Sequence, residues 1–172
     1  MSSPRFLVAV MLVVLAVLSR LIPHPPNFAP IGALALFGGA YFINKKHAFI
    51  IPLIAMFLSD LFLGFHNSII TVYVGFALIV FVGFKLRENK KVLPIALAAV
   101  SASIIFFIIS NFGVWIFGTV YPKNIFGLME CYVMAIPFFH NTLLGDLSYT
   151  AILFGGFYIA QIKFPVLAEQ KI

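Results

Sequence analysis

The sequence predicts an all-α integral membrane protein: a six-transmembrane-helix bundle with a re-entrant or surface segment before the last helix. Of the 172 residues, 63% are apolar and only 9% are charged, and the mean hydropathy is +1.12. Such a chain has too little polar surface to coat a globule in water. Its apolar residues also gather in runs separated by short polar segments, as expected of successive spans in a single transmembrane domain, 1–172.

Six apolar runs are the expected helices, at about 6–22, 29–43, 49–65, 69–84, 92–118 and 141–161. The proline-rich link 22–27 and four further polar segments separate the first five runs and end the fifth. Because about 20 residues cross a bilayer core, the shorter runs need flanking residues or burial among neighbouring helices. Pairs of small residues four apart, such as Ala35 and Gly39, predict close helix packing.

Two stretches bear on the count of spans. Residues 125–139 are apolar but contain Glu130 and Pro137, and a seventh span would move Lys163 and Lys171 outside. We therefore expect a re-entrant or surface segment there. The first run has the length of a signal peptide, but no A-x-A cleavage site follows it, so it is expected to remain as the first helix.

The basic residues predict the orientation. If the first helix starts in the cytoplasm, only Arg20 and Lys123 lie outside. The other basic residues then lie inside: Arg5, Lys45, Lys46, Lys85, Arg87, Lys90, Lys91, Lys163 and Lys171. This bias follows the positive-inside rule, so we expect a multi-pass protein of the bacterial cytoplasmic (inner) membrane with both termini in the cytoplasm. The basic residues accompany no nucleic-acid motif, so the expected partner is the lipid bilayer and nucleic acid is excluded.

Polar residues inside the apolar runs gather near the outer ends of the predicted helices. An ionisable group at the bilayer centre costs about 2.5–3.5 kcal/mol, so Asp60 and Asp146 should face the bundle interior or a wet cavity. Arg20 lies at the same depth and is available to neutralise one of them. We expect a pocket for a small-molecule substrate, opening outward and formed by Arg20, Asn27, Asp60, Asn111, Trp115, His140, Asn141 and Asp146. The alternative is a buried polar network that only fixes helix register.

Metal binding has only weak candidates. The residues with suitable donor atoms are His24, His66, Cys131 and His140. They show no local ligand spacing such as HxxxH, so neither a metal site nor a cofactor is expected. Cys131 has an apolar setting and reads as an inert small residue.

Four segments carry a resemblance to a known group of proteins. They read RLIPHPPNFAPIGA (20–33), SDLFLGFH (59–66), SNFGVW (110–115) and PFFHNTLLGD (137–146). The chain thereby resembles an uncharacterised family of small bacterial inner-membrane proteins. In helix number, size and the Gly145-Asp146 pair, that family is similar to the substrate-binding S components of energy-coupling-factor vitamin transporters.

This resemblance implies a bundle that captures a vitamin or related micronutrient from outside and hands it to an ATPase module. S components typically dock that module through an Ala-x-x-x-Ala face on helix 1. Here Ala9 and Ala16 are seven residues apart and position 13 is Val. A solitary transporter is therefore an alternative to a partner ATPase.

The expected function is substrate capture or transport and not catalysis. The sequence contains no HExxH, no GxSxG, no paired-Asp protease motif and no phosphate-binding loop. Two other classes stay open: an intramembrane metal-dependent enzyme that uses Asp60, Asp146 and the histidines, and a structural or assembly subunit without a ligand.

Overall fold

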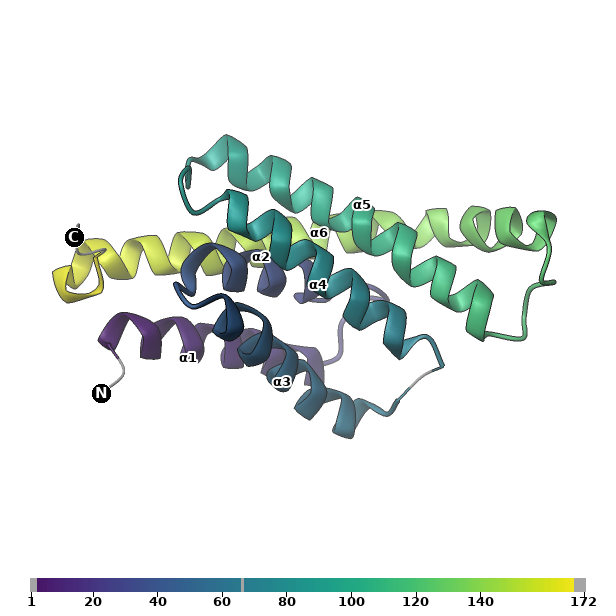
Figure 1. Cartoon of the computed structure of the whole chain (residues 1–172), viewed down its shortest axis with the longest axis horizontal. Coiled ribbons are helices and arrows are strands. Elements are labelled where there is room, and N and C mark those ends of the chain that lie inside the picture. Colours follow the sequence, from purple (N-terminus) through teal and green to yellow (C-terminus); the bar gives the residue numbers. More distant parts are fainter. Residues whose placement is uncertain (1–2, 66, 169–172) are drawn as a thin grey trace.

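The computed structural model describes residues 3–65 and 67–168, and this part of the chain forms helices and connecting segments without a strand. The elements are α1 (Pro4–Leu18), η1 (Ser19–Leu21), α2 (Ile31–Tyr41), α3 (Lys45–Leu63), α4 (Ile69–Lys85), α5 (Val92–Phe117), α6 (Ile125–Lys163) and η2 (Pro165–Leu167). Figure 1 shows them as an elongated bundle with both termini at one end. The predicted all-α class is confirmed.

Four helical stretches in the described residues are long and apolar enough to cross a membrane: Pro4–Leu21, α3, α5 and α6. Their outer surfaces carry large apolar side chains, including Phe62, which is 80% exposed, and Ile152. Such a surface suits hydrocarbon and indicates a membrane protein. Helices α2 and α4 are shorter, with 11 and 17 residues. At 1.5 Å per residue, α2 spans about 16 Å, roughly half of a 30 Å bilayer core.

The short helix α2 lies at the centre of the bundle. Each residue from 32 to 41 is buried, and α2 contacts α1, α3, α4, α5 and α6. Its closest approach is to α4. A Cβ atom added to Gly83 would stand 2.6 Å from the carbonyl oxygen of Leu36 and 3.0 Å from Cα of Gly39. Glycine on both helices therefore permits a crossing that any side chain would push apart.

Arg87, just after α4, binds the C-terminal end of α2. Its guanidinium donates to three carbonyl oxygens, those of Gly39 (2.8 Å), Phe42 (2.6 Å) and Ile43 (3.3 Å). It also lies over the ring of Phe84, 4.5 Å from the centroid. The last carbonyls of a helix lack intrahelical partners and carry negative partial charge, so a cation there stabilises the helix end. Burial lowers the pKa of Arg87, but a guanidinium stays charged.

The expected separate segment at 125–139 is instead the first part of α6, which continues without a break to Lys163. Pro137 lies inside this helix, where it removes one backbone hydrogen bond. The helix also packs against α5, where Tyr132 donates its hydroxyl hydrogen to the carbonyl oxygen of Ile108 (2.7 Å). The helix of 39 residues is about 58 Å long, so the α5–α6 hairpin extends beyond the ends of α3 and α4 (Figure 1).

Candidate functional site

A cavity of about 450 Å³ lies within the bundle, beside the ends of the shorter helices. It is enclosed by η1, the link to α2, the N-terminal ends of α2 and α4, the C-terminal end of α3, and the facing parts of α5 and α6. Its lining residues are Arg20, His24, Asn27, Ala29, Ile31, Gly32, Asp60, Leu63, Ser68, Val72, Phe106, Phe107, Ser110, Asn111, Val114, Ala135, Thr142 and Asp146. Small-molecule sites typically fall between roughly 300 and 1,000 Å³, so the size suits a small ligand.

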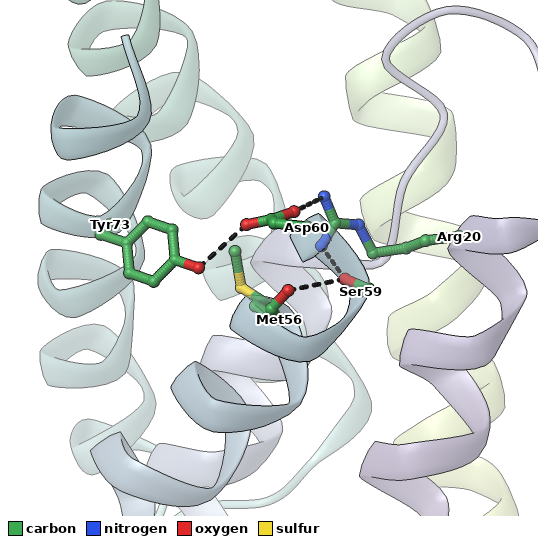
Figure 2. A network of polar contacts seen from close by, with 5 residues as sticks. All are labelled: Arg20, Met56, Ser59, Asp60 and Tyr73. Atoms are coloured by element: carbon green, nitrogen blue, oxygen red, sulfur yellow. Dashed lines mark hydrogen bonds and ion pairs between the residues drawn. The ribbon is translucent and has the colours of Figure 1, made fainter. Parts of the chain in front are cut away.

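An ion pair between η1 and α3 forms one side of this cavity (Figure 2). Nη2 of Arg20 donates to Oδ1 of Asp60 at 2.8 Å, and Nη1 donates to Oγ of Ser59 at 2.5 Å. The hydroxyl of Tyr73, on α4, donates to Oδ2 of Asp60 at 2.9 Å, and Ser59 donates to the carbonyl oxygen of Met56 at 2.7 Å. The Arg20 and Asp60 side chains are only 12% and 9% exposed. The expectation that Arg20 neutralises one aspartate is confirmed.

The second aspartate lies on α6 and binds the N-terminal end of α2. Asp146 accepts hydrogen bonds from the backbone N–H groups of Gly32 and Ala33 and, at 2.7 Å, from the hydroxyl of Ser103 on α5. The residue before α2 is Pro30, which supplies no side-chain cap. The carboxylate therefore takes the place of a local cap at the positive end of the helix. A Cβ atom at position 32 would lie 2.5 Å from Oδ1 of Asp146, so this contact requires glycine.

One face of α5 supplies much of the remaining wall. Phe106, Phe107, Ser110 and Asn111 line the cavity, and Nδ2 of Asn111 donates to the carbonyl oxygen of Phe107 at 2.8 Å. The wall thus combines two aromatic rings with a hydroxyl and an amide. Of these residues, only Asn111 belongs to the pocket predicted from the sequence. Phe106 and Phe107 precede Ser110 by four and three residues, a spacing that puts all three side chains on one face of a helix. This spacing could have identified the two rings from the sequence.

Five of the eight predicted pocket residues line the cavity: Arg20, Asn27, Asp60, Asn111 and Asp146. The other three do not. Trp115 donates from Nε1 to the carbonyl oxygen of Pro122 at 2.9 Å and so holds the loop between α5 and α6. Asn141 donates to the carbonyl oxygen of Pro26 at 3.0 Å, which ties the link to α6. His140 is exposed. The structure thus gives Trp115 and Asn141 contacts with loops beside the cavity.

The weak metal candidates are dispersed. His24 lines the cavity, with Nδ1 2.9 Å from the carbonyl oxygen of Pro25. Cys131 is buried with Sγ 3.5 Å from the carbonyl oxygen of Asn111, whereas His140 is exposed. His66 lies outside the described residues. Among the residues that are described, no three His, Cys, Asp or Glu side chains are grouped so as to hold a metal ion.

A family model described as a family of unknown function, DUF6580, matches residues 1–167. Comparison with curated proteins and with solved structures finds no match. The match covers nearly the whole chain, so it establishes family membership, and the likeness to S components stays a prediction.

Proposed function

We propose that this chain, which belongs to the family of unknown function DUF6580, captures a small polar molecule at the outer side of a bacterial cytoplasmic membrane. The proposed ligand is a vitamin or related micronutrient, held in the cavity of about 450 Å³. The observation that carries the proposal is that both buried aspartates, one of them paired with Arg20, line this single cavity. Ionisable groups inside a membrane bundle usually mark a ligand or ion pathway.

The arrangement of α2 supports this proposal. The helix is too short to cross a bilayer, and the cavity lies directly beyond its N-terminal residues Ile31 and Gly32. In membrane transporters, helices interrupted at this depth commonly end at the substrate site, because their free backbone ends must face protein or water. The link 22–30 crosses the remaining distance without helix, and its residues His24, Asn27 and Ala29 line the cavity.

The cavity wall suggests which ligand chemistry fits. Arg20 uses two of its five N–H donors in bonds to Ser59 and Asp60 within the described chain, so it has further donors for an anionic group. Phe106 and Phe107 offer an apolar surface beside these charges. A molecule with an anionic or strongly polar group and a flat apolar part matches this combination.

For the orientation, we propose six crossings with both termini in the cytoplasm. The termini lie at one end of the bundle (Figure 1), and most basic residues lie in the segments at that same end. Arg20 and Lys123 lie toward the other end, where the cavity is. The positive-inside rule then faces the cavity outward.

We propose capture without an ATPase module docked on α1. The face of α1 that corresponds to the docking face of S components contains Ala9, Val13 and Ala16. These residues are 2%, 0% and 8% exposed, so they pack inside the bundle. A partner could reach them only after α1 had moved away from its neighbours. The structure therefore favours a solitary protein over one that uses this face.

Mass spectrometry of small molecules that survive purification in mild detergent tests the proposal. The wild-type chain and two variants on α5 would be purified from the same host. Ser110→Phe places a ring in the cavity, whereas Ile104→Phe adds the same ring at a position that is 45% exposed on the outside of the bundle. We expect a compound that copurifies stoichiometrically with wild type and Ile104→Phe and is lost from Ser110→Phe. Equal retention by Ser110→Phe, or no retained compound in wild type, would contradict capture in this cavity.

A further inference from the structure

A second, larger cavity of about 810 Å³ lies between the beginning of α5 and the C-terminal half of α6, and we call it the α5–α6 groove. Residues of α5 and α6 line it, together with Tyr41 of α2 and with Lys90 and Lys91 just before α5. None of these residues lines the first cavity. Figure 1 shows α5 and α6 separating toward the end of the bundle that holds the termini, where the groove lies.

The walls of the groove are apolar and incompletely filled by protein. Ile95, Leu147 and Phe154 supply the apolar surface. Gly155 widens the groove, because a Cβ atom added there would meet no other atom within 4 Å. Val92, at the start of α5, is 85% exposed, so the groove opens at the side of the bundle, where lipid surrounds a membrane protein. A hydrocarbon chain fits such a space.

The mouth of the groove is basic. Lys90 and Lys91 line it at the start of α5, and the segment that contains them, 85–91, holds four basic residues and one acidic residue. Nζ of Lys90 donates to the carbonyl oxygen of Arg87 at 2.5 Å and lies 5.7 Å from the ring centroid of Tyr41. Basic residues next to an apolar groove at the membrane surface attract anionic lipid headgroups, at about 1 kcal/mol per Lys or Arg.

We propose that the α5–α6 groove binds one anionic phospholipid from the leaflet nearest the termini. An acyl chain lies between Ile95 and Phe154, and the headgroup phosphate is bound by Lys90 and Lys91. This site is independent of the ligand cavity and of the proposed capture function. It completes the packing of two helices that diverge at this end of the bundle.

Native mass spectrometry of the full chain in non-ionic detergent tests the site. Dioleoylphosphatidylglycerol and dioleoylphosphatidylcholine would be added in separate titrations. We expect one phosphatidylglycerol to bind wild type about 30-fold more tightly than phosphatidylcholine, which corresponds to two lysines at about 1 kcal/mol each. The double variant Lys90→Ala/Lys91→Ala should bind the two lipids alike. Equal binding of both lipids by wild type would overturn the headgroup assignment.

Adjacent glycines provide a matched pair of variants for the acyl chain. Gly155→Leu fills the groove, whereas Gly156→Leu adds the same side chain at the next residue, which does not line it. Both positions have open space around an added Cβ, so both variants should fold. We expect Gly155→Leu to lose phosphatidylglycerol and Gly156→Leu to keep it at equal melting temperature. Unchanged binding by Gly155→Leu would place the lipid elsewhere and refute the proposal.

Discussion

Removing one or both partners of the Arg20–Asp60 ion pair would show whether the pair stabilises the fold, serves the cavity, or does both. The single variants Asp60→Leu and Arg20→Met each leave one charge in the bundle without its partner. The double variant removes both charges together and keeps apolar side chains of similar length at both positions. A cycle of these three variants isolates the energy of the interaction from the effects of the individual substitutions.

The magnitude follows from the burial and contacts of the pair. At 12% and 9% exposure, both side chains are close to fully buried, and removal of one partner from a buried pair costs about 3–5 kcal/mol. The pair lines a cavity of about 450 Å³, and water there would reduce the cost, so we expect about 3 kcal/mol for Asp60→Leu. That substitution also leaves the hydroxyl of Tyr73 without its acceptor. The double variant leaves no unpaired charge and should lie within about 1–2 kcal/mol of wild type.

Reversible unfolding in mixed detergent and dodecyl sulfate micelles, followed by circular dichroism, measures these free energies. If the free energy of unfolding of each single variant falls by less than about 1 kcal/mol, the pair behaves as an exposed ion pair and its burial does not set its energy. Small-molecule retention by the double variant then addresses function. A purely structural pair predicts that the stable double variant still retains any ligand bound by wild type. Loss of that ligand from a folded double variant would instead assign the charges to binding.

Three further predictions concern the packing, the capping and the topology of the bundle. Gly83→Ala should lower the free energy of unfolding by about 1–3 kcal/mol in the same unfolding assay, because its Cβ overlaps α2. The control Gly156→Ala adds a Cβ in open space and should be neutral or slightly stabilising. Arg87→Gln should lower the free energy of unfolding by about 1.5–3 kcal/mol, because charged hydrogen bonds to the end of α2 are lost. Its control Lys85→Gln, at an exposed position, should change the free energy of unfolding by less than about 0.5 kcal/mol. With the native cysteine replaced, Lys123→Cys should react with an impermeant maleimide on intact spheroplasts and Lys85→Cys only after lysis; labelling of both from one side would contradict the six-crossing topology.

Hydropathy predicts most of the helices because each span must satisfy its backbone internally and present an apolar surface. It fails at residues 125–139, where Glu130 and Pro137 favour a break that the structure does not have. Glu130 is exposed on the surface of α6, and Pro137 costs the helix one hydrogen bond without ending it. The packing of α6 against α5 is a tertiary contact, so the local sequence does not reveal that the helix continues.

The cavity could be predicted in part because an ionisable residue inside an apolar run must face the interior of the bundle or a wet cavity. Asp60 and Asp146 carry that signal, and the structure brings both to the cavity. The aromatic wall carries no such signal, since Phe106 and Phe107 are two of 21 phenylalanines, many of which are exposed on the outer surface. His140 misleads because, unlike the two aspartates, it is exposed on α6 and does not line the cavity.

The position of the cavity follows from the length of α2. A central helix of 11 residues fills only about half the depth of a bilayer, and the five helices around it are longer, so space is left beyond one of its ends. Arg87 satisfies the C-terminal end on the side of the termini, and Asp146 satisfies the N-terminal end, which borders the cavity. Because side chains of other elements form hydrogen bonds with both ends of α2, the helix can remain short in a buried environment that would otherwise penalise free backbone groups. The carboxyl group of Asp146 therefore has a structural role even without a ligand, whereas Asp60 is bound by Arg20 and Tyr73 at the wall of the cavity.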